Sequence, residues 1–208
     1  MLRLILVRHG ETDWNVAGRY QGQTDIELNA AGREQARQVA ARLADQSFDA
    51  AYASDLKRAW ETAQIIAQQN GIDVQSEPRL RELRFGLIEG LTWAEAQEKY
   101  PGVIKHWLED RDQPPSGGEA ASVFTARVQA LIDDLVARHD EQTVLLVGHG
   151  GPLAEVIRLA LKMPPEGRWA FEIGNTSVSE LHIYGEDYHR PARLSRLNDT
   201  THLGNNHR

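Results

Sequence analysis

The sequence predicts an α/β domain in which helices cover both faces of a mainly parallel sheet, as a three-layer sandwich. Short continuous apolar runs at residues 4–7 and 143–147 are typical of strands that are buried on both faces. Stretches with apolar residues at helical spacing lie between the strand candidates. This alternation of strand and helix patterns favours a parallel sheet over other architectures.

The chain up to residue 76 alternates the two patterns. Asn29 stands where the first helical stripe begins, and its side chain can cap a helix N-terminus. Gly71 stands where the second stripe ends, as a glycine often does after a helix. In chain order, the predicted elements are a strand at 4–7, a helix at 29–43, a strand at 50–53, a helix at 56–67 and a strand at 72–74.

Residues 77–119 are less regular and are rich in proline and glycine, with one helical piece at 93–100. A loop-rich insertion of this length inside a compact domain usually has a function. We expect this segment to be a loop and helix insertion that lies over the active site.

The second half of the chain returns to the alternating pattern. Its predicted elements are a helix at 124–135, a strand at 143–147, a helix at 153–161 and strands at 178–184 and 192–197. We expect residues 1–198 to form a single domain and residues 199–208 to form a mobile tail.

Composition excludes several classes of site and partner. The 208 residues carry a formal net charge of −7, which disfavours nucleic acid and anionic lipid as partners. The absence of cysteine excludes thiolate catalysis, Cys-ligated zinc and iron–sulfur clusters. No signal-peptide pattern or apolar run of membrane-spanning length is present, so we expect a cytoplasmic protein.

Two histidines follow the two clearest strands. His9 comes at the end of the 4–7 run and His149 at the end of the 143–147 run, and a glycine follows each of them. A lone histidine at a strand end is as readily a structural residue as a functional one. Because the carboxyl ends of parallel strands meet at one edge of a sheet, two such residues are expected to converge on one site.

Two arginines are expected at the same edge of the sheet. Arg8 is next to His9, and Arg58 is at the start of the second helix. Guanidinium groups and helix N-termini both favour phosphate, so the expected guest is a phosphate monoester. The arginines would repel a metal cation, and we expect no metal and no other cofactor. The G-x-S-x-G, Walker, G-x-G-x-x-G and H-E-x-x-H motifs of other enzyme classes are absent from the sequence.

A phosphate pocket without a metal needs its own nucleophile, and a neutral imidazole can serve. The leaving alkoxide also needs a proton donor. Glu82 and Glu89 are the candidates, and spacing alone does not choose between them.

Several motifs occur in an order that is typical of one family. They are Leu6-Val7-Arg8-His9-Gly10-Glu11-Thr12, Trp14-Asn15, Gln21-Gly22, residues 25–32, residues 54–63, Arg81-Glu82 with Phe85-Gly86 and Glu89-Gly90-Leu91-Thr92, and Val147-Gly148-His149-Gly150-Gly151. The sequence thereby resembles the histidine phosphatase superfamily, also called phosphoglycerate-mutase-like, over nearly the whole chain.

The resemblance implies a role for each matching residue. His9 would be the nucleophile that forms a phosphohistidine, and Glu82 would be the proton donor. Arg8, Arg58 and His149 would bind the phosphoryl oxygens, Asn15 and Gly150 would add donors, and Gln21 and Gly22 would line the mouth. Glu89 would serve loop structure or cap the following helix.

The resemblance also implies the activity, a metal-independent phosphatase that acts on a small phosphorylated metabolite. The stretch between Glu82 and His149 is short, which favours the phosphatase branch over a cofactor-dependent phosphoglycerate mutase. Ile88 stands where many of these phosphatases carry an aromatic residue.

A catalytically silent phosphate-binding module is the second alternative. A homodimer could form if the strand at 180–184 is a free sheet edge.

Overall fold

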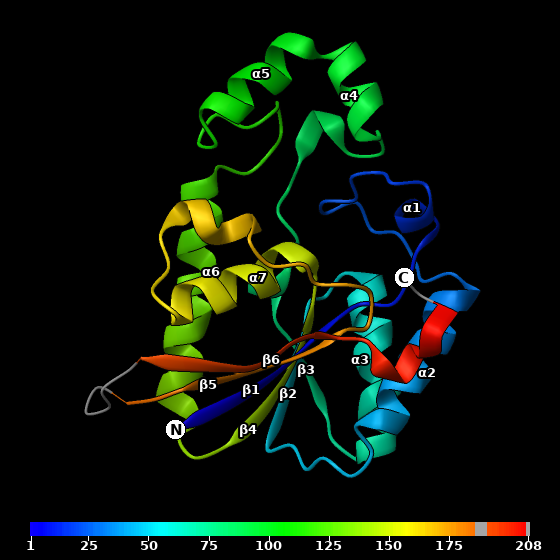
Figure 1. The fold of residues 1–208 in the computed structure, drawn as a ribbon, viewed down its shortest axis with the longest axis vertical. Helices are drawn as coiled ribbons and strands as arrows, with labels where there is room; N and C mark the ends of the chain where they lie inside the picture. The colour runs from blue at the N-terminus through cyan, green and yellow to red at the C-terminus, as the bar shows by residue number, and fades with distance from the viewer. Residues whose placement is uncertain (186–190, 207–208) are drawn as a thin grey trace.

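The structure, a computed structural model, describes residues 1–185 and 191–206. Its centre is a six-stranded sheet in the order β3-β2-β4-β1-β5-β6 (Figure 1). The first four strands of this order are parallel, and β5 and β6 run antiparallel to their neighbours. The strands are β1 (Leu2–Arg8), β2 (Ala50–Ala53), β3 (Val74–Ser76), β4 (Thr143–Gly148), β5 (Val178–Ile183) and β6 (Ala192–Asp199). The predicted α/β class with a mainly parallel sheet is therefore confirmed.

Helices cover the two faces of the sheet and also lie beyond its carboxyl edge (Figure 1). They are α1 (Asp13–Val16), α2 (Ala30–Arg42), α3 (Lys57–Asn70), α4 (Trp93–Lys99), α5 (Pro101–Glu109), α6 (Ala121–Arg138) and α7 (Gly150–Ala160). Short 3-10 turns are η1 (Pro78–Leu80), η2 (Gly86–Ile88), η3 (Pro165–Trp169) and η4 (Thr201–Asn206).

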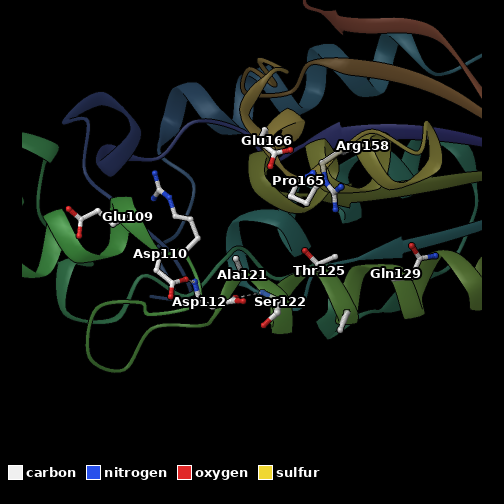
Figure 2. Close-up of a pocket in the computed structure, with 12 residues that line it drawn as sticks. Glu109, Asp110, Asp112, Ala121, Ser122, Thr125, Gln129, Arg158, Pro165 and Glu166 are labelled. Atoms are coloured by element: carbon white, nitrogen blue, oxygen red, sulfur yellow. Dashed lines mark hydrogen bonds between the residues drawn. The ribbon is translucent and has the colours of Figure 1, made fainter.

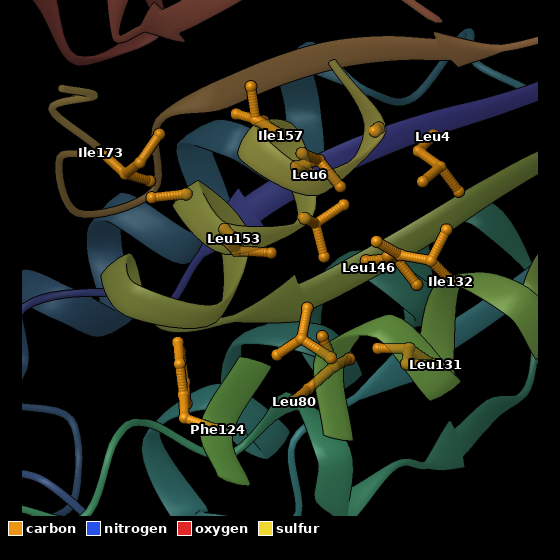
Figure 3. Packing of buried hydrophobic residues seen from close by; sticks show 14 of the residues in the cluster. Leu4, Leu6, Leu80, Phe124, Leu131, Ile132, Leu146, Leu153, Ile157 and Ile173 are labelled. Atoms are coloured by element: carbon orange, nitrogen blue, oxygen red, sulfur yellow. The ribbon is translucent and has the colours of Figure 1, made fainter. Parts of the chain in front are cut away.

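Alternate residues of each central strand enter two different cores. Leu4 and Leu6 of β1 belong to the core beneath α6 and α7, which also holds Phe124 (Figure 3). Ile5 and Val7 face the other core, beneath α2 and α3. Because side chains alternate across a strand, a run that is apolar at every position requires cover on both faces, and it has that cover here.

Helix ends follow local sequence signals. The Asn29 side chain accepts a hydrogen bond from Gly32 N at 2.8 Å and caps α2. Gly71 ends α3 with a φ of 63°, a conformation that glycine adopts without strain. The predicted strand at 72–74 lies two residues further along, at Val74–Ser76.

The insertion at 77–119 contains the predicted helix, as α4, and a second helix, α5, that was not predicted. Both lie beyond the carboxyl ends of the parallel strands (Figure 1). Arg19 joins this region to the segment after α1, since its guanidinium donates to Gly90 O at 2.6 Å and pairs with Glu95 at 2.7 Å. The insertion is therefore fastened to the loops at the same sheet edge that holds the histidines.

The end of the chain differs from the expected mobile tail. Residues 201–206 form η4, which packs against α2 and buries Leu203. Arg42 of α2 donates to Thr201 Oγ1 at 2.8 Å and pairs with Asp199. This segment is polar except for Leu203, so its sequence gives no apolar pattern from which the packing could be predicted. Residues 207–208 lie outside the described part of the chain.

The strand at 180–184 is not a free edge of the sheet, which is a second difference from the expectation. β5 pairs with β1 on one side and with β6 on the other, so β6 and β3 are the edges of the described sheet. The hypothesis of a homodimer depended on a free edge at 180–184, and this edge is absent from the described sheet. Within residues 1–185 and 191–206, no helix is long and apolar enough to cross a membrane.

Candidate active site

His9 and His149 lie side by side at the carboxyl ends of neighbouring strands. β1 pairs with β4 so that Arg8 lies opposite Gly148, and each histidine follows directly. Their ring centroids are 5.0 Å apart, with the ring planes at 61°. Both side chains are buried. With Arg8, Arg58 and Glu82, they form the cluster that is called the cup below.

A backbone carbonyl determines which nitrogen of His9 carries the proton. His9 Nδ1 lies 2.7 Å from Gly10 O. Since a carbonyl can only accept, Nδ1 carries the hydrogen and Nε2 presents its lone pair. Burial, together with the charges of Arg58 and Arg8, holds the pKa of His9 well below its usual value of 6.5. The ring is therefore neutral at pH 7, with Nε2 able to act as a nucleophile.

The backbone around His9 is held by residues from other parts of the chain. Gly10 N donates to Thr62 Oγ1 of α3 at 3.1 Å. Asn175 Nδ2 donates to His9 O at 2.9 Å, and Thr176 N donates to Arg8 O at 3.0 Å. Sequence patterns assigned no role to Thr62, which lies in the motif at residues 54–63, or to Asn175 and Thr176, which lie in none of the motifs, because all three act through hydrogen bonds to the main chain.

Arg58 is fully buried on the first turn of α3. Its Nη1 donates to Thr24 O at 2.9 Å, and its Nη2 donates to Gly22 O at 2.7 Å. Burial lowers its pKa to about 10, so it keeps its charge at pH 7. The Nε atom is buried and has no hydrogen-bond partner in the protein.

Arg8 repeats this arrangement from the end of β1. Its Nη1 donates to Ile173 O at 2.6 Å, while its buried Nε has no partner in the protein. In the described part of the chain, no carboxylate forms an ion pair with Arg8 or Arg58. Arg58 is fully buried and Arg8 is half-buried, and each keeps a buried Nε donor without a partner. Such groups are costly to desolvate, and an anion that binds between them would offset that cost. The cup is therefore suited to an oxyanion such as a phosphoryl group.

His149 caps the start of α7 and is fully buried. Its Nε2 lies 2.9 Å from Ser54 Oγ, and its Nδ1 is buried without a partner. Burial and the charge of Arg58 hold the pKa of His149 well below 6.5, so this ring is also neutral at pH 7.

Glu82 reaches the cup from the segment after η1 and sits against the N-terminus of α7. Its Oε2 accepts from Gly151 N at 3.1 Å, and its Oε1 accepts from Leu83 N at 2.8 Å. An ideal Cβ atom on Gly151 would lie only 2.1 Å from Oε1. The glycine thus leaves the space in which the carboxylate sits.

The other predicted binding residues surround the cup. Asn15 Oδ1 accepts from Thr12 N at 3.1 Å in the capping box of α1, so its NH₂ group is the part that can donate to a ligand. Gln21 is buried, and its Oε1 has no partner in the protein. Gly22 offers its carbonyl to Arg58. Gly150 begins α7 beside Arg8, whose Nε lies 3.9 Å from the ideal Cβ position.

Glu89 holds a loop together and does not enter the cup. Its carboxylate accepts from Gln23 N at 3.2 Å, Thr24 N at 3.0 Å and Phe85 N at 2.9 Å. The helix that follows is capped by Thr92 and Glu95 instead. These contacts match the expected role in loop structure, and they separate Glu82 from Glu89, which spacing alone did not.

A cavity of about 820 Å³ lies outside the cup, between the end of α5, the start of α6 and η3 (Figure 2). Two arginines line it. Arg158 is already neutralised by Glu155, with Nε 2.8 Å from Oε2, and the Arg111 guanidinium lies 4.3 Å from the centroid of the Trp107 ring. Several carboxylates line its wall, and they would repel a phosphate: Glu109, Asp110, Asp112 and Glu166. Across the described residues, no group of three or more histidine and carboxylate side chains could hold a metal ion.

Comparisons with known proteins agree over nearly the whole chain. A family model described as the histidine phosphatase superfamily (branch 1) matches residues 4–200. Phosphoserine phosphatase 1 of Hydrogenobacter thermophilus is 35% identical over 205 residues, which cover 98% of this chain and 95% of the relative. A probable phosphoglycerate mutase of Enterobacter sp. (strain 638) is 37% identical over 184 residues, which cover 87% of this chain and 85% of the relative.

Solved structures share the fold. A mycobacterial glucosyl-3-phosphoglycerate phosphatase, solved in complex with VO3, has a TM-score of 0.82 and 37% sequence identity. The match covers 94% of this chain and 98% of that chain. These proteins are similar to this chain in both sequence and three-dimensional structure.

Proposed function

Because the chain belongs to the histidine phosphatase superfamily, we propose that it hydrolyses phosphomonoesters of small metabolites through a phosphohistidine at His9, without a metal. Relatives that are named as phosphatases support the reaction class. The relatives' names include a phosphoserine and a glucosyl-3-phosphoglycerate phosphatase, so the substrate proposed here is a small phosphorylated metabolite.

One observation carries the proposal. Nδ1–H of His9 donates a hydrogen bond to Gly10 O, which leaves Nε2 of His9 unprotonated. This nucleophile lies among guanidinium groups whose Nε donors have no partner in the protein. A phosphoryl group in the cup would meet donors for its oxygens and a lone pair for its phosphorus.

In the first step, Nε2 of His9 attacks the phosphorus, and the bond from phosphorus to the ester oxygen breaks. The protonated carboxyl of Glu82 gives its proton to that leaving oxygen, so the product leaves as an alcohol. Arg8, Arg58 and His149 stabilise the charge that builds on the equatorial oxygens.

In the second step, water attacks the phosphohistidine. The Glu82 carboxylate takes a proton from the water, the bond from phosphorus to Nε2 breaks, and inorganic phosphate leaves. Glu82 is then protonated again and His9 is neutral, so the site is restored. The anchoring of Glu82 at Gly151 keeps one carboxyl group in position for both proton transfers.

The test measures turnover of p-nitrophenyl phosphate in EDTA and trapping of an acid-labile phosphoenzyme. We expect turnover and trapping with the wild type and neither with His9→Ala. His106→Ala is the matched control, because His106 is exposed on α5 and should behave as wild type. Loss of turnover in EDTA would exclude metal independence, and equal labelling of His9→Ala would exclude this nucleophile.

Mutase activity is the second candidate, and similarity to a probable phosphoglycerate mutase supports it. It would use the same phosphohistidine but return the phosphoryl group to a second hydroxyl. An assay with 3-phosphoglycerate and a bisphosphate primer separates the two. We expect release of phosphate to outrun isomerisation, and the reverse result would favour the mutase.

A further inference from the structure

We propose that Ser54 is a positioning residue that makes His149 a hydrogen-bond donor toward the phosphoryl group. It does so by occupying the imidazole Nε2 with its hydroxyl hydrogen. This inference rests on the proposed function, since it assigns a task to a residue behind the same cup.

The serine and the histidine are held together by neighbouring strands. Ser54 follows β2 directly, and its N donates to Val147 O of β4 at 3.0 Å. His149 follows the end of that same strand. The two side chains meet at 2.9 Å, and both are fully buried. Ser54 therefore cannot exchange this contact for water without a rearrangement of the sheet edge.

The surrounding hydrogen bonds assign the direction of this contact. Leu56 N donates to Ser54 Oγ at 3.3 Å, so the serine oxygen already accepts from the main chain. Its hydroxyl hydrogen needs an acceptor, and His149 Nε2 is the acceptor within reach. A neutral imidazole has one N–H group, so an Nε2 that accepts leaves the hydrogen on Nδ1.

The alternative tautomer conflicts with the proposed ligand. If Nε2 carried the hydrogen, the buried Nδ1 would present a lone pair, and the Ser54 hydroxyl hydrogen would lose its acceptor. A lone pair repels phosphoryl oxygens, whereas an N–H group stabilises them. Nδ1 has no partner in the protein, so its hydrogen is available for a ligand.

Both rings of the cup carry their hydrogen on Nδ1, but their neighbours leave a different nitrogen of each ring free for the ligand. At His9, a carbonyl acceptor fixes the hydrogen on Nδ1 and leaves Nε2 as the nucleophile. At His149, a hydroxyl donor occupies Nε2 and leaves Nδ1–H as a donor. Two neutral imidazoles 5.0 Å apart can therefore perform different tasks in the same electrostatic environment.

The first test is ¹⁵N NMR of the imidazole nitrogens in the resting protein, with His149 assigned through His149→Gln. In the wild type we expect a protonated Nδ1 and an unprotonated Nε2 at His149. In Ser54→Ala we expect signals that move toward the other tautomer, and in Ser54→Thr, which keeps a hydroxyl, we expect the wild-type pattern. This readout needs no substrate, so it stands or fails independently of the phosphatase activity.

The second test is kinetic. Ser54→Ala is expected to lower kcat by about 10- to 100-fold, with a smaller change in KM, and Ser54→Thr is expected to recover most of kcat. Ser179→Ala is the matched control, because Ser179 is similarly buried on β5 but its Oγ accepts from Asn198 N and lies outside the cup. A wild-type His149 with its proton on Nε2 would overturn the proposal. So would a Ser54→Ala protein with unchanged tautomer and kcat.

Discussion

Arg58 has two effects on the chemistry of the cup at the scale of single residues. It offers a buried donor to an anion, and its charge lowers the pKa of His9. Burial is the larger cause of the low pKa of His9, and the Arg58 charge adds to it. The same guanidinium group thus contributes to an anion site and to a neutral imidazole.

Arg58→Met removes both effects, while Arg58→Lys keeps the charge. Without the positive charge, the imidazolium form of His9 is less disfavoured, so the pKa of His9 rises. We expect the acid side of the kcat/KM profile of Arg58→Met to move to higher pH, and kcat/KM at pH 7 to fall about 100-fold. Arg58→Lys should keep the wild-type pH profile. An unshifted profile in Arg58→Met, with His9 titration followed by NMR, would contradict this account.

The residues of the site divide according to how they act. His9, His149 and the arginines could be predicted, because each lies where a strand or helix pattern begins or ends and carries a reactive side chain. The contacts of Asn175 and Thr62 could not, because these side chains bind the main chain of His9 and Gly10. Such contacts join segments far apart in the sequence, and no local pattern encodes them.

At the scale of elements, the N-terminus of α7 and the Glu82 segment form one unit. The carboxylate accepts from Gly151 N, and only the missing side chain of Gly151 leaves room for it. The position of the Glu82 carboxylate is thus set by α7, the helix that begins directly after His149.

Gly151→Ala should lower the activity without lowering the stability of the fold. The new methyl group would overlap Glu82 Oε1, and the flexible carboxylate is the group that can move away. We expect kcat to fall at least about 10-fold while the urea midpoint stays near that of the wild type. Gly102→Ala on α5 is the control, because its Cβ position is open and the change should leave kcat unaltered. Wild-type kcat in Gly151→Ala would show that the position of Glu82 is not critical.

The elements show where sequence patterns succeed. The long helices were predicted because their apolar stripes are continuous, and Asn29 and Gly71 mark real ends. α5 was missed because Pro101 suggests a break, whereas proline is tolerated in the first turn, and here it begins a new helix. η4 was missed because one buried leucine in a polar segment gives no periodic signal.

At the scale of the whole molecule, η4 brings the last described residues into contact with α2 and with Thr176. His202 lies there between Thr176 and α2, with Nε2 3.4 Å from Thr176 Oγ1. Burial, with a further effect of Arg42, lowers the pKa of His202 to about 4. The end of the chain therefore supports the segment that holds Arg8 and His9.

This histidine should make global stability depend on pH. In the unfolded chain His202 titrates near 6.5, and in the folded protein near 4. As pH falls through this window, the unfolded chain takes up a proton that the folded protein refuses, so the free energy of unfolding falls. We expect His202→Asn to lose less stability than the wild type between pH 6.5 and 4, as measured by urea midpoints.

His9 and His149 contribute in the same direction in both proteins, so the difference between the two curves reports on His202. If the urea midpoints of the wild type and His202→Asn changed with pH in parallel, His202 would be solvated or charged in the folded protein.

The pairing of β1 with β4 has a consequence for biosynthesis. On the ribosome, His9 is synthesised long before β4, the strand that delivers the second imidazole. The loop that steadies both Arg8 and His9 emerges later still. Translation products that stop before residue 173 are therefore expected to be inert toward phosphate esters, and activity should arise only once residues 173–175 have been made.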